Sequence, residues 1–400
     1  MKELIEPNAA RQHIASHLPE IPVIDCPLNK CAGRVLRQNI KADRPFPPFN
    51  RSMMDGFAAR ASEAEYGREL AIAGFAPAGA EQIQNGNAPM NCIEIMTGAI
   101  LPNGADCVIP YEDTEKIDQH TIRITNKGPI ATGDFVHAKG SDFETGKILI
   151  KAGIRLGSRE IAAAATCGYA KLKVSKIPRI AIACSGDELV EVNQAPELHQ
   201  IRRSNDFCIE TALARLHLQS AERTHLPDER TTAQSKLQTL IHENDFVVLS
   251  GGVSMGKKDF LPDLLNELGL GCHFHGIAQK PGKPMGYWTN STCAVFALPG
   301  NPLSTLTCLH HYVIPALFKA MGLTRMEETQ MVSVDRTQSV RKDFTAFLPA
   351  KLNKDQTVTP CPPQNSGDLV RILHSDGYIL IPAGEAAATA GDTYEFRPWH

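Results

Sequence analysis

The sequence predicts a multidomain protein with α/β and all-β parts, and three observations indicate this fold class. The chain has 400 residues, too many for one hydrophobic core, which favours roughly two to four domains. Residues 45–142 contain short apolar runs separated by Gly, Pro and Asn, a pattern typical of a small β module. Residues 177–325 alternate strand-like and helical segments, which favours a central α/β domain with a mostly parallel sheet.

The other segments complete the predicted organisation. Residues 1–44 and 143–176 form an elongated N-terminal domain, into which the β module is inserted. Helical patterns at 7–18 and 157–170 flank the insertion. Residues 326–400 form a C-terminal β domain, with strand-like runs at 331–334, 345–348 and 377–381.

Composition excludes several classes of function. The net charge of −3 provides no global field that would attract nucleic acid or an anionic membrane. No apolar run reaches the roughly 18 residues of a membrane span, and the polar, acidic N-terminus does not resemble a signal peptide. The eleven cysteines are scattered without a CxxC pair, which predicts reduced, mostly buried thiols. We therefore expect a cytoplasmic protein.

Apolar periodicity predicts the elements of the α/β domain in order. Asp228 is a suitable N-cap for a helix that ends near His242. The predicted strands are 179–184, 246–249 and 293–298, and the other predicted helices are 205–216, 261–268 and 303–321.

Four loops follow predicted strand ends, at 185–188, 250–259, 280–284 and 299–304. In open parallel sheets, ligands bind beyond the carboxyl ends of the strands. We therefore expect these loops to form one site.

The loop at 280–284 holds two lysines around a Pro-Gly turn. Gly282 permits a positive φ, and the flanking prolines stiffen the turn that carries Lys280 and Lys283. Two ammonium groups repel by about 4 kcal/mol at 4 Å and an effective dielectric near 20. Such a pair favours a bound anion, although a solvated basic turn is the alternative.

The glycine-rich loop at 250–259 favours a phosphate. Gly251 and Gly252 offer backbone N–H groups, Ser250 and Ser254 offer hydroxyls, and the loop opens onto a helix. Carboxylates near a phosphate repel it unless a divalent cation lies between them. The acidic side chains expected to hold such a cation are Asp187, Glu188, Asp228 and Asp259. For Asp259, a simple helix cap is the alternative.

Motifs along the whole chain then identify a family. PPFNRSMMDGFA, IMTGAILP, SGDEL, LSGGVSMGKKDF, KPGKP and LPGNPLST occur in this order. This arrangement resembles the molybdopterin molybdenumtransferases of the MoeA type, which include the E domain of gephyrin. The resemblance implies a MogA-like central domain. It also implies Mg²⁺-dependent insertion of molybdenum from molybdate into adenylated molybdopterin, with release of AMP.

The resemblance assigns roles position by position. Asp55, Thr97, Asp142 and Glu188 are the implied catalytic residues, and Asp228, Asp259 and Glu188 are the implied ligands of Mg²⁺. The implied substrate-binding residues are Asp187, Ser250, Gly251, Gly252, Ser254, Lys280, Lys283, Pro299, Gly300, Asn301, Arg341 and Ser366. Considered alone, the proline-rich loop that carries Asp55 also fits a linker.

Three positions depart from the family pattern: Asn50, Phe57 and Lys257. Lys257 adds positive charge beside Asp259, which is expected to bind metal. We expect this charge to change the affinity for metal and not the type of reaction.

The resemblance implies a homodimer, an upstream adenylyltransferase and downstream proteins that mature molybdoenzymes. Two alternatives stay open. A molybdopterin adenylyltransferase would not need the inserted module or the C-terminal domain, and a non-catalytic scaffold would not need to keep its acidic site residues.

Overall fold

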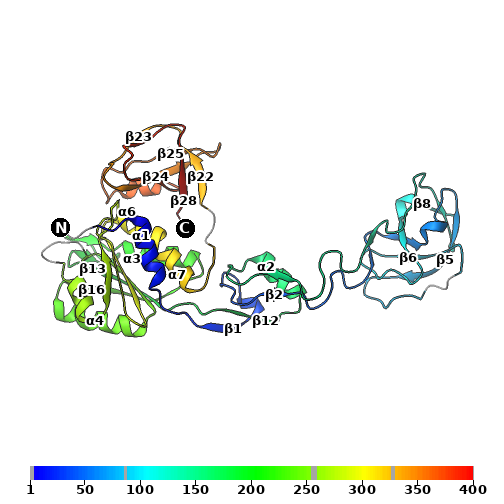
Figure 1. The fold of residues 1–400 in the computed structure, drawn as a ribbon, viewed down its shortest axis with the longest axis horizontal. Helices are drawn as coiled ribbons and strands as arrows, with labels where there is room; N and C mark the ends of the chain where they lie inside the picture. Colours follow the sequence, from blue (N-terminus) through cyan, green and yellow to red (C-terminus); the bar gives the residue numbers. More distant parts are fainter. Residues whose placement is uncertain (1–3, 85–87, 254–258, 326–328, 400) are drawn as a thin grey trace. The chain divides into compact units, whose positions relative to one another are not determined.

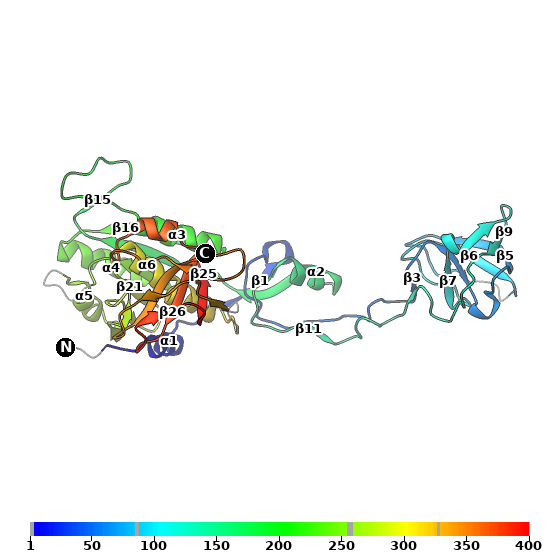
Figure 2. The same ribbon diagram turned by 90° about the horizontal axis from the view of Figure 1, so that it is seen from above.

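The computed structural model describes residues 4–84, 88–253, 259–325 and 329–399. The chain divides into two compact units (Figures 1 and 2). The larger unit comprises Met1–Gln38, Ala152–Ile161 and Ala170–His400, and the smaller unit comprises Asn39–Lys151 and Ala162–Tyr169.

A six-stranded sheet forms the centre of the larger unit. Its strand order is β16-β13-β17-β21-β20-β18, and the first four strands are parallel, which confirms the predicted mostly parallel sheet. The bounds are β13 Ile180–Ser185, β16 Ser220–Leu226, β17 Phe246–Ser250, β18 Gly271–His275, β20 Gly286–Thr289 and β21 Ala294–Leu298.

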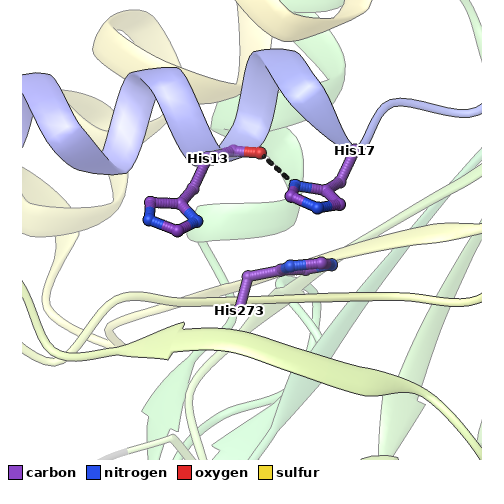
Figure 3. Close-up of side chains that lie close together, drawn as sticks. All are labelled: His13, His17 and His273. Carbon is purple, nitrogen blue, oxygen red and sulfur yellow. Dashed lines mark hydrogen bonds between the residues drawn. The ribbon is translucent and has the colours of Figure 1, made fainter.

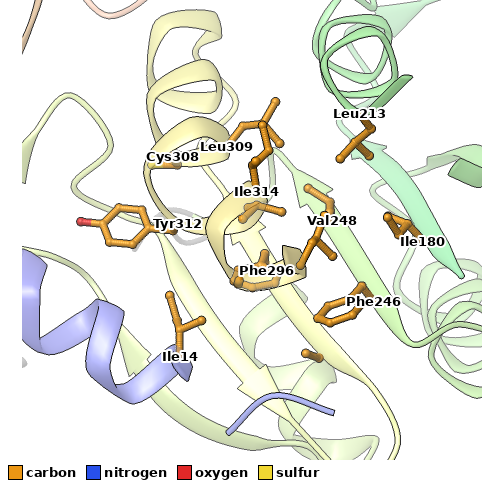
Figure 4. Close-up of a cluster of buried hydrophobic side chains, with 14 of the residues drawn as sticks. Ile14, Ile180, Leu213, Phe246, Val248, Phe296, Cys308, Leu309, Tyr312 and Ile314 are labelled. Atoms are coloured by element: carbon orange, nitrogen blue, oxygen red, sulfur yellow. The ribbon is translucent and has the colours of Figure 1, made fainter. Parts of the chain in front are cut away.

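Both faces of this sheet are covered by helices, because successive strand residues point to opposite sides. Phe246 and Val248 of β17 pack in one cluster with Leu213 (Figure 4), while Val247 packs with Leu240 on the other face. The covering helices are α1 Pro7–Ser16, α3 Asn205–Arg215, α4 Arg230–Glu243, α5 Leu261–Glu267, α6 Pro302–Cys308 and α7 Ile314–Ala320.

One local prediction in this domain is wrong, and one predicted helix is present but contains an irregular segment. Asp228 does not cap α4: the carboxylate of Glu229 accepts hydrogen bonds from the amides of Thr231 and Thr232, at 2.9 and 2.7 Å. The helix predicted over 303–321 is interrupted by a π-helical segment, Leu309–Val313. Pro315 explains the interruption, since proline lacks the N–H that a regular helix needs at that position.

A second sheet lies towards the C-terminus, with order β19-β24-β26-β28-β22 and β25 beside β24. Its bounds are β19 Gln279–Lys280, β22 Gln330–Ser333, β24 Thr345–Leu352, β25 Val358–Pro360, β26 Gly377–Ile381 and β28 Thr393–Pro398. The sequence led us to expect that the lysine turn follows a strand of the parallel sheet. This prediction is wrong, because the turn follows β19, which pairs with β24 of the C-terminal sheet.

Short elements complete the larger unit. They are β1 Val23–Pro27 paired with β12 Lys171–Ser175, β14 Leu189–Val190 with β15 Ile201–Arg202, β23 Gln338–Ser339 with β27 Ala387–Ala388, α2 Ser158–Thr166 (shared with the smaller unit) and α8 Leu369–Leu373.

The smaller unit contains a six-stranded sheet of order β7-β4-β6-β5-β9-β8, which packs around Phe57, Leu70 and Ile109. The bounds are β4 Gly56–Ala59, β5 Glu69–Ala76, β6 Asn91–Ile95, β7 Cys107–Pro110, β8 Thr114–Lys116 and β9 Thr121–Ile124. Two short pairs accompany it: β3 Arg51–Ser52 with β10 Val136–His137, and β2 Ile40–Lys41 with β11 Ile148–Ile150.

Most of the eleven cysteines are buried and none forms a disulfide in the described chain, as the sequence predicts. Among the described residues, no helix has the length and apolar character needed to cross a membrane.

Candidate active site

A cavity of about 430 Å³ lies at the carboxyl ends of the parallel strands β13, β17 and β21, and we call it the sheet-end pocket. β13 connects outward to β16 on one side, and the chain then returns to β17 on the other side. Ligands of open α/β sheets bind at such a reversal of strand order. The predicted site residues that line the pocket are Glu188, Asp228, Ser250, Gly251, Gly252, Asp259, Pro299, Gly300 and Asn301.

Close approach of three loops explains the glycines in the pocket wall. Gly251 has a φ of +91°, and a Cβ atom there would lie 2.5 Å from the carbonyl oxygen of Ser185. A Cβ at Gly300 would lie 3.5 Å from the Cα of Gly251. The Gly251 amide donates to the Leu298 carbonyl at 3.1 Å, so this residue contributes close packing instead of the free N–H group that the sequence suggested.

Asn205, which sequence reasoning missed, connects two of these loops. Its Nδ2 donates to Ser250 Oγ at 2.9 Å and to the Gly300 carbonyl at 2.7 Å. Asn205 is the first residue of α3, so the sequence marked it only as a residue near a helix start. Its role depends on the contact with loops that lie far along the chain.

Asp187 and Asp228 hold each other in place. The Asp228 amide donates to Asp187 Oδ1 at 2.9 Å, and the Asp187 amide reaches Asp228 Oδ2 at 3.4 Å. Ser185 Oγ also donates to Asp228 Oδ1 at 3.4 Å. The Glu188 carboxylate lies beside Gly186, where a Cβ atom would be 2.4 Å from Oε2. The two acidic loops are therefore joined, and the carboxylates of Glu188 and Asp228 lie at the pocket, whereas Asp187 does not line it.

The pocket also contains arginines that the sequence analysis did not select. Arg202 and Arg203 both line it. Arg203 is buried and pairs with the fully buried Asp206 at 3.2 Å and with Glu191 at 3.3 Å. Arg202 is exposed and donates to the Gln194 carbonyl at 3.1 Å. The adjacent basic residues at 202–203 were the available sequence signal.

The lysine turn lies at the edge of this region. Gly282 has a φ of +95°, as predicted, and Pro284 of the same turn lines the pocket, whereas Lys280 and Lys283 are exposed and do not line it. The ring of Phe344 lies beside both Lys283 Nζ, at 5.6 Å from the ring centroid, and Arg341 Cζ, at 5.5 Å. The turn and the C-terminal sheet thus bring two cations to one aromatic ring.

Ser366 is connected to the pocket through Asn301. Asn301 Nδ2 donates to Ser366 Oγ at 2.6 Å, and the Leu303 amide donates to the Ser366 carbonyl at 3.2 Å. Two predicted substrate-binding residues from separate parts of the chain are therefore in contact.

The smaller unit brings together Asp55 and Thr97. Both the amide and the hydroxyl of Thr97 donate to Asp55 Oδ1, each at 2.7 Å. These two hydrogen bonds, the one from the hydroxyl most strongly, lower the pKa of the exposed Asp55 carboxyl. Asp55 is therefore held as an ionised carboxylate.

Asp142 belongs to a different chain of contacts in the same unit. Arg51 Nη2 lies 3.2 Å from His137 Nδ1, and His137 Nε2 lies 2.9 Å from Asp142 Oδ1. Arginine only donates hydrogen bonds, so Nδ1 accepts and the proton of a neutral His137 is on Nε2, facing Asp142. Arg51 and His137, which the sequence analysis did not select, therefore orient this carboxylate.

Two predicted features cannot be placed: Ser254 and Lys257 lie outside the described residues. Asn50 accepts a hydrogen bond from the Lys139 amide at 2.8 Å, and Phe57 is buried in the sheet of the smaller unit.

Cavities of about 480 and 730 Å³ lie beside α1 and α7, but they contain none of the predicted site residues.

Comparisons with known proteins agree along the chain. Residues 5–168 match the MoeA N-terminal region (domain I and II), residues 181–319 a probable molybdopterin binding domain, and residues 337–399 the MoeA C-terminal region (domain IV). A molybdopterin molybdenumtransferase of Synechocystis sp. is 36% identical over 403 residues, covering 99% of this chain and 100% of the relative. One of Staphylococcus epidermidis is 30% identical, covering 98% and 93%.

Solved structures show the same fold. A molybdopterin biosynthesis MoeA protein from Pyrococcus horikosii has a TM-score of 0.81 and 27% identity, with both chains fully covered. A second, from Pyrococcus horikoshii OT3, has a TM-score of 0.85 at 23% identity, covering 99% of this chain and 100% of that chain. The chain belongs to the MoeA family of molybdopterin molybdenumtransferases.

Proposed function

We propose that this protein is a transferase of molybdenum cofactor biosynthesis that inserts molybdenum from molybdate into adenylated molybdopterin and releases AMP. The observation that carries the proposal is the sheet-end pocket, where glycine-rich loops and carboxylates meet at the strand-order reversal. The names of the curated relatives support the reaction class.

The phosphates of adenylated molybdopterin bind at loops 250–252 and 299–301 in this proposal. The glycines at 251, 252 and 300 let the loops of the pocket wall pack closely against one another and form a compact wall for the ligand. Arg202 supplies positive charge from the pocket wall, and Lys280 and Lys283 supply it from the adjoining turn. Charge-assisted hydrogen bonds to phosphate are the strong ones, so these cations contribute much of the affinity.

The donor set of the pocket fits Mg²⁺. Glu188, Asp228 and Asp259 offer hard carboxylate oxygens, although no three carboxylates in the described chain bring ligand atoms within 4.8 Å of one another. Mg²⁺ commonly uses only one or two carboxylates together with substrate phosphates, so a three-carboxylate cage is not required. When bound, Mg²⁺ would neutralise charge on the phosphates. The reciprocal bonds of Asp187 and Asp228 keep the two acidic loops in position for this role.

Molybdate is a dianion and needs cations and hydrogen-bond donors. Lys283 and Arg341 lie beside the same Phe344 ring, and Ser366 contacts Asn301 of the pocket wall. We assign the molybdate to this group of residues. Asp55 and Asp142 are acidic and would repel it, so their roles are to accept hydrogen bonds from the pterin or to transfer protons.

The proposal includes a homodimer in which the Asp55 of one copy acts on substrate bound by the other. At a low substrate concentration, Asp55→Ala is expected to be inactive alone because it lacks the reacting residue, and Lys283→Ala to have little activity because it binds the substrate weakly. Dissociating the two variants and reassembling them together should restore part of the activity. Each mixed dimer then contains one site in which the Lys283 of one copy and the Asp55 of the other are both intact. No recovery in confirmed mixed dimers would reject this arrangement.

AMP release from purified adenylated molybdopterin, measured with and without molybdate, tests the function directly. We expect molybdate-dependent and Mg²⁺-dependent release. Asp55→Ala should bind the substrate and release little AMP, while Lys283→Ala should bind it about ten- to a hundredfold more weakly, the range for a lost charge-assisted hydrogen bond. Lys319→Ala, at the end of α7, is the matched lysine control and should behave as wild type.

The alternatives give different results in the same assay. An adenylyltransferase would make adenylated molybdopterin from molybdopterin and ATP, and a scaffold would turn over neither substrate. In the proposed setting the protein is cytoplasmic, receives its substrate from an adenylyltransferase, and passes the cofactor to proteins that mature molybdoenzymes. Co-purification with such partners is the corresponding test.

A further inference from the structure

Three histidines form a cluster that the proposed reaction does not use. His13 lies in the last turn of α1, His17 is the residue that caps the end of this helix, and His273 lies on β18, facing them from the sheet (Figure 3). One ring nitrogen from each histidine lies within 4.8 Å of the others. Among the described residues, no other three potential metal ligands lie so close together.

The fold holds the two elements firmly together. Ala10 and Ile14 of α1 are buried in the core, which fixes the face of the helix that carries the histidines. Tyr287 Oη donates to the His17 carbonyl at 2.8 Å, and the Ile5 amide donates to the Gly276 carbonyl at 3.2 Å. Both ends of α1 are therefore tied to the strands beside His273.

A break in strand pairing coincides with His273. Cys272 is opposite Trp288 and Phe274 is opposite Tyr287, so His273 is an extra residue without a partner in the register. β18 is an edge strand, and bulges at sheet edges redirect side chains. This irregularity lies beside the end of α1, because the ring centroids of His17 and His273 are 4.0 Å apart, so the unpaired position and the other two histidines occur together.

Hydrogen bonds leave lone pairs for a metal. His17 Nδ1 lies 2.8 Å from the His13 carbonyl, which can only accept, so Nδ1 donates and a neutral His17 keeps its lone pair on Nε2. His273 Nε2 lies 2.6 Å from Thr289 Oγ1, and when the hydroxyl accepts, Nδ1 keeps the lone pair. Metal-binding histidines commonly donate their second nitrogen to an oxygen in this way.

Ring stacking is the alternative reason for the cluster, because the His17 and His273 ring centroids are 4.0 Å apart. Stacking accounts less well for His13, because its exposed ring, although nearly parallel to that of His17, has its centroid 6.3 Å away. Zn–N bonds of about 2.0–2.1 Å place ligand nitrogens roughly 3.3 Å apart in a tetrahedron. The nitrogens must therefore move inward on binding, and the exposed His13 and His17 side chains have room to do so.

We propose that His13, His17 and His273 bind a divalent first-row transition metal ion of the Zn²⁺ class, with a fourth position open to solvent. Imidazole nitrogens select such ions, whereas the carboxylates of the sheet-end pocket suit Mg²⁺. The bound ion joins α1 to β18, so it stabilises the larger unit by mass action. This site is independent of the proposed transferase reaction.

The test uses the full chain without a histidine tag. Cys272 is exposed and adjacent to His273, so all variants carry Cys272→Ser to remove a competing thiol ligand. Zn²⁺ is titrated by calorimetry, and Co²⁺ is titrated by its visible absorption. His13→Ala, His17→Ala and His273→Ala are compared with His242→Ala, an exposed histidine at the end of α4.

We expect one ion per chain, a higher melting temperature with Zn²⁺, and at least about a tenfold loss of affinity in each ligand variant, since even the loss of an outer-shell partner costs 10–100-fold. His242→Ala should bind as the parent does. Equal affinity in all variants, or no saturable binding up to about 1 mM Zn²⁺, overturns the site. If His273→Ala does not fold, the exposed His13→Ala and His17→Ala variants decide the result.

Discussion

Replacing Gly251 with alanine tests the close packing of the loops around the sheet-end pocket. Gly251 follows β17 directly, and its positive φ lets the chain turn beneath the loop that follows β13. The added Cβ would meet the Ser185 carbonyl oxygen at 2.5 Å. This contact is with backbone, so a side-chain rotation cannot relieve it.

Two terms set the expected destabilisation. A residue with a Cβ in the left-handed region costs about 1–2 kcal/mol. Overpacking of a tightly packed site adds about 1–3 kcal/mol. Gly269 provides a matched control, because its φ is +84° and nothing lies within 4 Å of the added Cβ. Gly251→Ala should therefore cost about 2–5 kcal/mol, and Gly269→Ala only the first term, about 1–2 kcal/mol.

Urea unfolding followed by tryptophan fluorescence measures the difference. The chain has two tryptophans, and Trp288 is buried in the parallel-sheet domain, so a Trp399→Phe background isolates its signal. With a slope of about 2 kcal/mol per M, the midpoint should fall by about 1–2.5 M for Gly251→Ala and by about 0.5–1 M for Gly269→Ala.

Ligand binding gives a second readout of the same change. Movement of the loop away from Ser185 should weaken binding of adenylated molybdopterin by about tenfold or more, which corresponds to about 1.4 kcal/mol. Gly269→Ala should leave binding unchanged. If the two variants lose equal stability and bind equally well, the inferred contact between the Gly251 and Ser185 loops is wrong.

Three further predictions concern single side chains. Asn205→Ala should lower the urea midpoint by about 0.5–1 M, since it removes two hydrogen bonds, to the buried Ser250 hydroxyl and to the Gly300 carbonyl, at a net cost of about 1–2 kcal/mol; an unchanged midpoint would contradict the bridging role. Thr97→Val removes one donor to Asp55, so the pKa of Asp55 should rise and the acid limb of the AMP-release profile should move to higher pH, whereas an unmoved limb would show that this carboxyl does not control the rate. Hydrogen bonds from the Thr232 hydroxyl, then from the Thr232 amide and the Thr231 amide, lower the pKa of Glu229 to about 2, so its stabilisation is present above the unfolded pKa near 4.3 and is lost as pH falls towards 2. Thermal melts of Glu229→Gln and wild type should therefore differ at pH 7 and converge by about pH 2, and a constant difference would refute the cap.

The apolar runs of the chain were sufficient to predict the architecture. Strands such as 246–249 and 293–298 carry apolar residues on both faces, and helical segments separate them, so burial on both sides of a parallel sheet was expected. The glycine at 282 was also readable, because a Pro-Gly turn needs a positive φ and local backbone sterics decide this. Such features depend on neighbours within a few residues.

The motifs also predict much of the pocket. Glu188, Asp228 and Asp259 and the glycines at 251, 252 and 300 were expected to converge, and they line one cavity. This inference succeeded because loops at the carboxyl ends of parallel strands necessarily lie at one edge of the sheet. The geometry of the sheet, and not any single residue, carried the prediction.

Only the tertiary structure decided which side chains bridge the loops and which sheet each segment joins. Asn205 contacts Ser250 and Gly300, and β19 pairs with β24 of the C-terminal sheet. His17 meets His273 only because the C-terminal end of α1 lies beside β18. Local propensity describes interactions between residues close in sequence. Contacts between distant segments instead depend on how complete elements pack, and many pairings satisfy the same local pattern equally well.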